Sequence, residues 1–360
     1  MVSIVVGGHY GDEGKGKVVS YLALKDNPTC IARAGVGPNA GHTVWHEGKK
    51  YGLRMISCGF VNPKSKIFIG AGVLVDIKRL TDEVELTSTK GRVFVDKRCI
   101  VIDEEHKAAD AGEGSKKIGT TGSGCGPANA ARVNRVAKQA KDYPELRQYI
   151  TDVAETVNDA IDAGEEVIIE ASQGFGLSLY FGNYPYVTSK DTSASSAAAD
   201  IGVGPTRVDE VYVIYKAYMS RVGADPFIHY LTDEEVKDSK VWSDALKRAE
   251  AAGFQGTTNE KIASYFKEVG TVTGRPRKIG SFDFKLARYS ARVNGATQIC
   301  VTCLDKLFPE CAGVRDIRKL SKDARSHVRE IEDKVGVKVT LISTGPDVYD
   351  VIDLRDGLTG

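Results

Sequence analysis

The 360-residue sequence predicts an α/β protein with a mostly parallel central sheet and helices on both of its faces. Two observations support this fold class. Short apolar, β-branched runs alternate along the chain with segments of helical pattern, an order typical of parallel sheets. A glycine-rich segment, residues 11–17, follows the first apolar run, which predicts a P-loop-like phosphate-binding loop between a strand and a helix.

The elements follow from these patterns in chain order. We expect strands at residues 4–6, 67–69, 167–169, 211–215, 299–302 and 337–342. We expect helices at residues 128–141, 145–163, 284–294 and 322–334. Ligands of such folds gather beyond the carboxyl ends of the strands, so the motifs that follow the apolar runs are the candidate site.

We expect a single domain over residues 1–360, with a charged helical insertion at about 232–268. The charges of that insertion alternate in sign, which predicts a solvated surface without a convergent site.

Composition narrows the class of protein. The formal net charge is +1, which gives no electrostatic reason to expect binding to nucleic acid or to an acidic membrane. No apolar run approaches the length of a membrane span. Seven scattered cysteines predict free thiols and a cytoplasmic location.

The glycine-rich segment carries the first chemical signal. Residues 11–17 read Gly-Asp-Glu-Gly-Lys-Gly-Lys, so three glycines allow close backbone approach to an anion and two lysines add positive charge. The spacing fits G-x-x-x-x-G-K, but Val18 stands where Ser or Thr normally supplies an oxygen to Mg²⁺. Asp12 is the candidate to replace that oxygen.

A second glycine-rich segment presents a histidine and an amide. Residues 39–43 read Asn-Ala-Gly-His-Thr and follow Gly-Val-Gly-Pro at 35–38. Together the two segments resemble the adenylosuccinate synthetase family, in which both motifs are characteristic. Further matches follow in chain order at residues 118–122, 173–174, 184–189, 221–223, 271–275, 304–305 and 343–346. The chain is most similar to the compact archaeal form of that family.

The resemblance implies a ligase that joins L-aspartate to C6 of a 6-oxopurine nucleoside 5′-monophosphate. O6 would first attack the γ-phosphate of a nucleoside triphosphate, and the aspartate amino group would then displace phosphate from C6. Asp12 would remove the N1 proton, and His42 would donate a proton or hydrogen bond to the transferring phosphoryl group. The Asp12 carboxylate and the Gly41 carbonyl would bind Mg²⁺.

The resemblance also implies binding roles, position by position. The expected donor-nucleotide residues are Gly11, Asp12, Glu13, Gly14, Lys15, Gly16, Lys17, Arg277, Cys303, Asp305, Ser343, Thr344 and Gly345. The expected acceptor residues are Asp12, Asn39, Ala40, Gly41, His42, Thr121, Arg135, Gln173, Thr188 and Arg275. The expected aspartate-binding residues are Thr271, Val272, Thr273, Gly274, Arg275 and Arg277. Arg135 would reach the acceptor bound by a neighbouring subunit, which implies a homodimer.

The chain departs from the usual family pattern around the two nucleotides. The altered positions are His9, Tyr10, Asp225, residues 228–230, Ser281 and Cys303. A phage branch similar to this family is thought to use dGMP, and a carboxylate at Asp225 could accept from the 2-amino group of such an acceptor. We therefore favour dGMP over IMP as the acceptor, with IMP as the alternative. The aspartate at position 12 argues against the phage branch, in which serine often stands at this position. If the source is a phage, the cytoplasm is that of its host.

The identity of the donor stays open among GTP, ATP and dATP. Cys303 stands in the position of a lysine of the donor-base motif, which weakens the case for GTP, whereas Asp305 supports guanine.

Two other classes of protein remain as alternatives: a GTPase-type regulator and a catalytically inactive nucleotide-binding module. Release of phosphate only when donor, acceptor and aspartate are all present would exclude both.

Overall fold

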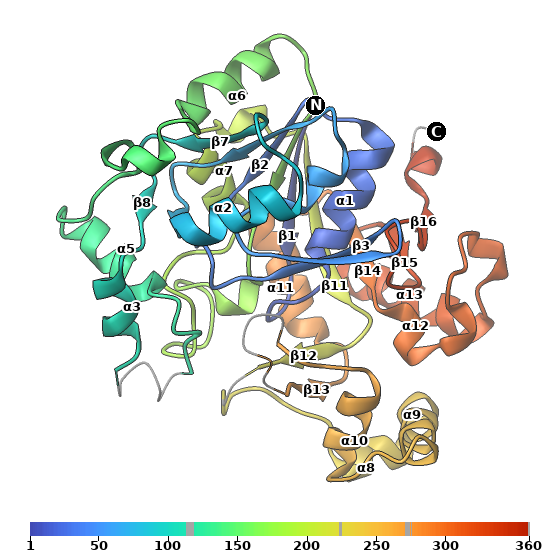
Figure 1. Ribbon diagram of the computed structural model, residues 1–360. Coiled ribbons are helices and arrows are strands. Elements are labelled where there is room, and N and C mark those ends of the chain that lie inside the picture. Colours follow the sequence, from blue (N-terminus) through green and yellow to red (C-terminus); the bar gives the residue numbers. More distant parts are fainter. Residues whose placement is uncertain (113–118, 223–224, 271–273, 275, 359–360) are drawn as a thin grey trace.

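The central sheet of the computed structural model is built from the apolar runs of the sequence. The model describes residues 1–112, 119–222, 225–270, 274 and 276–358. The strands of the sheet are β1 (Val2–Gly7), β2 (Cys30–Arg33), β5 (Lys66–Ile69), β7 (Val93–Asp96), β9 (Ile150–Thr151), β10 (Val167–Glu170), β11 (Glu210–Lys216), β14 (Gln298–Thr302), β15 (Val339–Ser343) and β16 (Val351–Asp353). Within the described residues the strand order is β16-β15-β14-β11-β1-β10-β2-β5-β7-β9 (Figure 1).

All neighbouring pairs in this sheet are parallel except β15 and β16, which pair antiparallel at one edge. Three small two-stranded sheets complete the described strands: β3 (His42–His46) with β4 (Lys49–Leu53), β6 (Leu74–Val75) with β8 (Ile100–Val101), and β12 (Met219–Arg221) with β13 (Lys278–Gly280). The prediction of a mostly parallel sheet is confirmed.

Helices cover both faces of the sheet. The α-helices of the described residues are α1 (Lys15–Asp26), α2 (Ile77–Leu86), α3 (Glu104–Asp110), α5 (Cys125–Val133), α6 (Val153–Asp162), α7 (Ala194–Ile201), α8 (Asp233–Asp238), α9 (Lys240–Ala251), α10 (Thr258–Tyr265), α11 (Phe284–Asn294), α12 (Leu304–Leu307) and α13 (Lys322–Val335). Helices α1 and α2 cover one face, and α6, α7, α11 and α13 cover the other. None of the helices in the described ranges is both long and apolar enough to cross a membrane.

Strand alternation divides the core into two layers. Val2, Ile4 and Val6 of β1 face the layer that contains α6, α7, α11 and α13, whereas Val5 faces the layer that contains α1 and α2. Successive side chains of a strand point to opposite faces, so a strand that is apolar throughout must be covered on both sides. The continuous apolar runs of the sequence therefore account for the two helical layers.

Two of the predicted helices are wrong in part. The helix expected at 128–141 is α5, which ends at Val133, and the helix expected at 145–163 is α6, which begins only at Val153. Between these helices Ile150 and Thr151 pair with β7, and the Asp152 side chain then caps the N-terminus of α6. Pairing with the sheet therefore overrides the helical pattern at 145–152.

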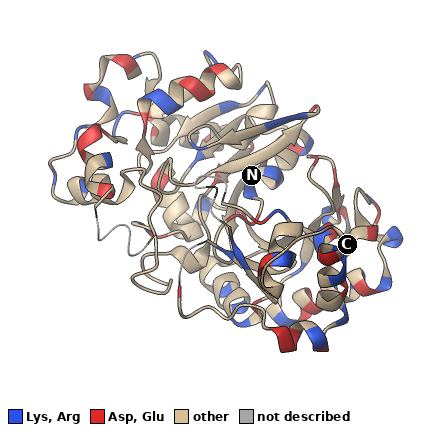
Figure 2. Ribbon diagram, turned by 60° about the horizontal axis from the view of Figure 1, so that its bottom comes forward, with Lys and Arg blue, Asp and Glu red and all other residues tan. Residues whose placement is uncertain are grey.

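The segment that we predict as an insertion, residues 232–268, contains helices and is not solvated throughout. Helices α8, α9 and α10 lie below β12 and β13 in Figure 1. Trp242, Ile262 and Phe266 are buried within the larger apolar core. Across the described chain, Lys and Arg alternate with Asp and Glu along the outer helices (Figure 2).

Candidate functional site

The candidate residues gather at one edge of the sheet. The glycine loop follows β1, Asn39 lies in the loop after β2, and Gln173 lies just after β10; these three strands are neighbours in the order β1-β10-β2. On the other side of β1, Cys303 and Asp305 follow β14, and Thr344 and Gly345 follow β15. Because all five strands are parallel, the loops after them share the carboxyl edge, where ligands of such sheets bind.

The glycine loop has the geometry of an anion cradle. Gly11 and Gly14 have φ of 91° and 86°, and Asp12 between them has φ of 58°. Glycine takes positive φ without strain, and Asp is one of the few other residues that tolerates it. Gly14 caps α1 without a side-chain hydrogen bond, so the first N–H groups of the helix remain directed at the loop.

The Glu13 carboxylate fixes the shape of this loop. It accepts hydrogen bonds from the backbone N–H groups of Gly11 (2.7 Å) and His9 (3.2 Å) and forms a buried ion pair with Lys15 (2.7 Å). Burial alone would raise the pKa of Glu13, but the Lys15 ammonium holds that pKa below its usual value. Glu13 and Lys15 therefore neutralise each other in the free protein.

Lys17 contacts the loop after β15. Its ammonium donates to Ser343 Oγ (2.7 Å), to the Gly345 carbonyl (2.5 Å) and to the Asp350 carbonyl (2.9 Å). Burial lowers the pKa of Lys17 to about 8. These hydrogen bonds connect the end of the glycine loop to Ser343 and Gly345, two of the residues expected to bind the donor base.

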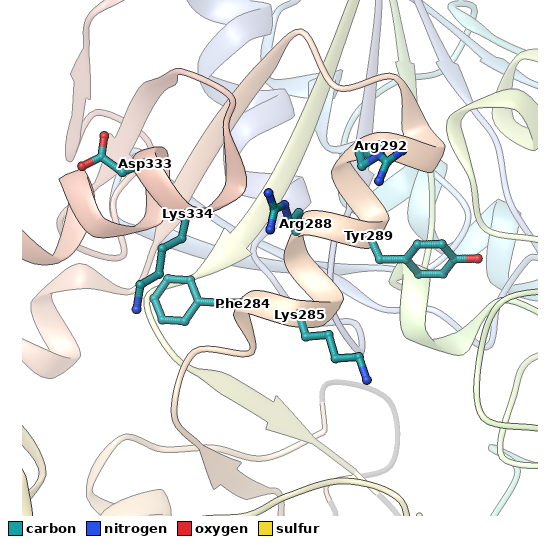
Figure 3. Close-up of a pocket in the computed structure, with 7 residues that line it drawn as sticks. All are labelled: Phe284, Lys285, Arg288, Tyr289, Arg292, Asp333 and Lys334. Carbon is teal, nitrogen blue, oxygen red and sulfur yellow. The ribbon is translucent and has the colours of Figure 1, made fainter.

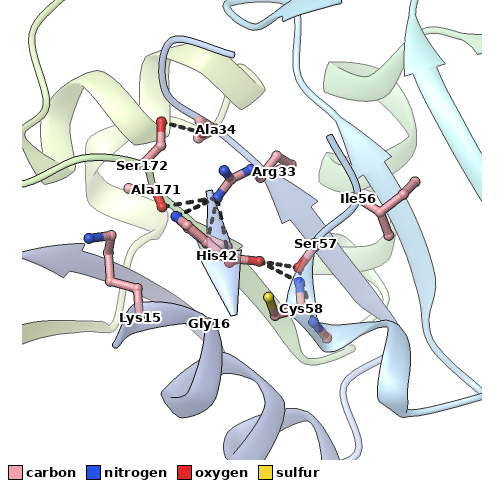
Figure 4. Close-up of polar contacts among 12 residues, drawn as sticks. Lys15, Gly16, Arg33, Ala34, His42, Ile56, Ser57, Cys58, Ala171 and Ser172 are labelled. Atoms are coloured by element: carbon pink, nitrogen blue, oxygen red, sulfur yellow. Dashed lines mark hydrogen bonds and ion pairs between the residues drawn. The ribbon is translucent and has the colours of Figure 1, made fainter. Parts of the chain in front are cut away.

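His42 lies in a buried cluster that the sequence analysis did not identify (Figure 4). Its Nδ1 contacts Glu170 Oε1, and Arg33 Nη1 lies 3.2 Å from its Nε2. Glu170 also accepts from the hydroxyl of Ser57 and from the Cys58 N–H (2.9 Å). A carboxylate at Nδ1 favours the tautomer with the proton on Nδ1, which leaves Nε2 as an acceptor.

Charge balance in this cluster favours a neutral His42. Burial lowers the pKa of His42, and the Arg33 guanidinium lowers it further. Burial would raise the pKa of Glu170, but His42 and Arg33 together hold it below its usual value. Arg33 therefore balances the Glu170 charge. His42 would need to gain a proton before it could donate one from Nε2.

The lowered pKa of His42 makes folding stability depend on pH. In the unfolded chain His42 takes up a proton as pH falls through 6.5, but the folded protein resists that proton until a lower pH. Stability should therefore decline below pH 6.5, with at most about 1.4 kcal/mol per pH unit from this group. His42→Asn should remove this contribution. Urea unfolding of both proteins at several pH values checks it, and equal slopes of unfolding free energy below pH 6.5 would contradict it.

The expected acceptor residues form a chain of polar side chains. Gln173 Nε2 donates to Asn39 Oδ1 (2.9 Å), and Asn39 Nδ2 donates to Thr188 Oγ1 (3.2 Å). Gln173 Oε1 is buried without a hydrogen-bond partner in the described structure. A buried acceptor without a partner is costly, so this oxygen is suited to a ligand donor.

Two further acceptor candidates, Thr121 and Arg135, make none of the hydrogen bonds of this chain in the described structure. Thr121 contacts Ser123 Oγ at 2.8 Å, and Arg135 is exposed with φ of 64°. Val133 and Val136, which flank Arg135, are each 75% exposed.

Arg277 is the described member of the expected aspartate site that reaches the glycine loop. Its Nη2 lies 2.5 Å from Asp12 Oδ2, and the Asp12 side chain is 29% exposed. Gly274 is exposed with φ of 64°. Thr271, Val272, Thr273 and Arg275 lie outside the described residues.

The Asp225 carboxylate does not support the argument for dGMP. It lies 3.3 Å from Arg221 Nη1, and it accepts from Asn183 Nδ2 (3.0 Å) and from the Phe227 N–H (2.9 Å). Asp225 is buried with these partners. The substitution therefore completes an internal network, and its oxygens are already used by protein donors.

Two other altered positions also have internal partners. His9 packs between the rings of Tyr215 and Phe282, and its Nε2 lies 3.1 Å from the Asp283 carbonyl. Ser281, where the family usually has Trp, accepts a hydrogen bond from Trp242 of the insertion (3.2 Å).

A separate cavity of about 480 Å³ lies between α11 and α13 (Figure 3). Its lining residues are Phe284, Lys285, Arg288, Tyr289, Arg292, Asp333 and Lys334. None of the expected site residues lines it. In Figure 3 the Lys285 and Asp333 side chains point away from the middle of the group.

Sequence reasoning missed Glu170 and Arg33. Each is the last residue of a buried apolar strand, β10 and β2, at the same edge as the glycine loop. A charged residue at the end of a buried apolar strand, just before a polar motif, is the sequence signal that could have identified both residues.

A sheet of this topology, with a glycine loop leading into an uncapped helix, is the architecture of enzymes that bind phosphorylated ligands. The family model of adenylosuccinate synthetase matches residues 4–145 and 136–310. The chain belongs to the adenylosuccinate synthetase family and is therefore a ligase that forms a carbon–nitrogen bond.

Individual relatives agree with the family match. Adenylosuccinate synthetase of Methanosphaera stadtmanae is 52% identical over 98% of both chains, and that of Archaeoglobus fulgidus is 54% identical over 98% of both chains. Fully ligated adenylosuccinate synthetase from Plasmodium falciparum superposes with a TM-score of 0.83 at 22% identity, covering 98% of this chain and 99% of that chain. Cyanophage S-2L succinoaminodeoxyadenylate synthetase, bound to dGMP and dATP, gives 0.76 at 23% identity, covering 100% of this chain and 97% of that chain. At these identities the two structures support the fold alone.

Proposed function

We propose that this protein joins L-aspartate to C6 of IMP and consumes a nucleoside triphosphate, with GTP as the donor. The observation that carries the proposal is the full-length similarity, above 50% identity, to relatives named adenylosuccinate synthetase. These relatives favour IMP, which the sequence analysis held as the alternative. The preference for dGMP is not supported, since its phage counterpart is distant and Asp225 already has protein partners.

The chemical difficulty lies in the purine carbonyl. Its oxygen is a poor nucleophile, and hydroxide is a poor leaving group from C6. A base that removes the N1 proton makes O6 electron-rich, and phosphorylation of O6 makes the oxygen expellable. Asp12 is suited to be this base, because its partly exposed carboxylate lies in the glycine loop. Gln173, Asn39 and Thr188 would orient the acceptor from the neighbouring loops.

Three groups would stabilise the negative charge of the transferring phosphoryl group. The uncapped N–H groups of α1 are directed at the loop, and the Arg277 guanidinium lies beside it. His42 would contribute through Nε2 once a proton reaches that nitrogen.

The donor set near the loop is suited to Mg²⁺. The Asp12 carboxylate and the Gly41 carbonyl are oxygen donors, which this hard cation prefers. When bound, Mg²⁺ would neutralise phosphate charge. Donor-base recognition would fall to Asp305, which follows β14, and to Ser343, the last residue of the neighbouring strand β15.

The test is a matrix of assays with aspartate fixed. IMP, GMP, dGMP and dIMP are each combined with GTP, ATP and dATP, and the succinyl product and free phosphate are measured. Product from IMP with GTP is expected. Product from dGMP but not from IMP would overturn the acceptor assignment. Phosphate release in the absence of acceptor or aspartate would favour a GTPase-type regulator.

The exposed Arg135 tests the proposal of a homodimer. Arg135→Leu should raise the KM for IMP roughly tenfold or more and leave kcat nearly unchanged, because loss of a charged phosphate contact affects binding. Steady-state kinetics at fixed GTP measures both constants. Arg147→Leu, another arginine on the exposed surface, is the matched control. An unchanged KM in Arg135→Leu would argue against a subunit-crossing contact.

The cytoplasmic location stays a prediction.

A further inference from the structure

A buried network of charges connects the glycine loop to the end of the insertion. Glu268 follows α10, and its carboxylate accepts two hydrogen bonds from the Lys216 ammonium (2.7 and 2.8 Å) and one from the hydroxyl of Tyr218. The same carboxylate contacts Arg277 Nη1 at 2.7 Å. All four side chains are buried.

Arg277 continues the network to the expected base. While Nη1 contacts Glu268, Nη2 contacts Asp12 at 2.5 Å, so a single guanidinium bridges two carboxylates. The four charged groups, Lys216, Glu268, Arg277 and Asp12, sum to zero. Removal of the central carboxylate would therefore leave a buried excess of positive charge.

The backbone strengthens the same connection. The Arg277 N–H donates to the Glu268 carbonyl at 3.0 Å, and Val269 and Pro276 form an isolated β-bridge next to it. Glu268 and Arg277 are thus joined by both main chain and side chain. Through Lys216, at the carboxyl end of β11, the pair is anchored to the central sheet beside β1.

We propose that Glu268 is a positioning residue: it holds the Arg277 guanidinium by Nη1 so that Nη2 remains directed at Asp12 and at the anion that binds there. This inference rests on the proposed function and deepens it. Before the acceptor and donor bind, Nη2 pairs with Asp12. When a phosphate or carboxylate ligand arrives, Nη2 can exchange partners while Nη1 keeps the guanidinium in place.

The burial of Arg277 supports this role. A planar guanidinium fixed at one nitrogen loses less freedom when the other nitrogens bind a ligand. Arg277 Nε is buried without a hydrogen-bond partner in the described structure, so the side chain keeps a further donor unused. Glu268 is the last residue of the segment in which the sequence analysis expected no convergent site.

The test compares Glu268→Gln and Glu268→Asp with wild type. Glu268→Asp keeps the charge balance but shortens the side chain by one methylene, which moves the guanidinium. Displacement of a positioned group by about 1 Å can cost roughly 10²-fold in rate, so a loss of that order in kcat is expected for both variants. The KM for IMP should change little, because Asn39, Gln173 and Thr188 are not part of the network. A kcat for Glu268→Asp equal to that of wild type would overturn the proposal.

The double variant Lys216→Met/Glu268→Gln separates positioning from charge compensation. It removes the excess charge, so its unfolding midpoint should recover relative to Glu268→Gln while kcat stays low. Recovery of both quantities would mean that Glu268 only compensates Lys216. Glu250→Gln, which breaks the exposed pair with Lys261 in the same insertion, is the matched control and should behave as wild type.

Calorimetric titration with GTP distinguishes failure of the proposed function from failure of the positioning role of Glu268. If wild type forms no succinyl product from any acceptor, the proposed function fails, and GTP affinity still reports on Arg277. Weaker GTP binding in Glu268→Asp than in Glu250→Gln would then support the positioning role, and equal binding would overturn it.

Discussion

Asp12→Asn should lower kcat by about 10²–10⁴-fold, because it removes the proposed base while preserving the shape of the side chain. Asn tolerates positive φ as Asp does, so the backbone at φ of 58° is not strained by this change. Asp12 is the most exposed carboxylate of the network, at 29%, and Arg277 keeps its ion pair with Glu268 when the Asp12 charge is removed. Folding should therefore be retained.

The measurement is the rate of succinyl product formation at saturating IMP, GTP and aspartate, together with the unfolding midpoint. Asp82→Asn, which breaks an exposed pair with Lys78 in α2, serves as the control variant. An undiminished rate in Asp12→Asn would remove Asp12 from the mechanism and with it the proposed activation of O6.

Glu170→Gln should destabilise the protein by about 3–5 kcal/mol, because Arg33 would keep a buried charge without its anionic partner. Natural domains are stable by only about 5–15 kcal/mol, so this is a large share of the total. Turnover should also fall, since the anionic acceptor that favours the Nδ1–H tautomer of His42 is replaced by a neutral amide, which is a weaker acceptor and can also turn an NH₂ donor toward the ring.

Chemical denaturation at low temperature measures the change in unfolding free energy. Initial rates, taken at a temperature below the thermal unfolding midpoint of the variant, measure the change in turnover. Glu47→Gln provides the matched control: Glu47 lies between β3 and β4, and its side chain is 84% exposed. A Glu170→Gln protein with the unfolding free energy of wild type would show that the buried cluster does not require this carboxylate.

The sequence was sufficient for the glycine loop and for six of the ten strands of the sheet, but β2, β7, β9 and β16 were not predicted. Residues 4–6, 167–169 and 211–215 are apolar on both faces, which only a covered strand accommodates, and the loop motif specifies its own place after the first of them. The helices at 284–294 and 322–334 were predicted within one residue, because Asp283 and Ser321 cap their starts and glycines follow their ends.

The polar clusters were not predictable in the same way. Glu170 lies 128 positions from His42, and Glu268 lies 52 positions from Lys216, so no local spacing connects the partners. Only the tertiary fold brings these side chains together. The roles of the individual site residues and the single-domain organisation stay predictions.

The order of the strands has a consequence for synthesis of the chain. β1 leaves the ribosome well before its partners in the sheet, because β10 and β11 begin only at Val167 and Glu210. A mostly apolar strand therefore has no partner in the sheet while more than a hundred further residues are translated. Pairing between strands so far apart in the sequence slows folding and leaves an aggregation-prone nascent segment exposed. We expect that truncated chains ending before β11 aggregate rather than accumulate as soluble fragments.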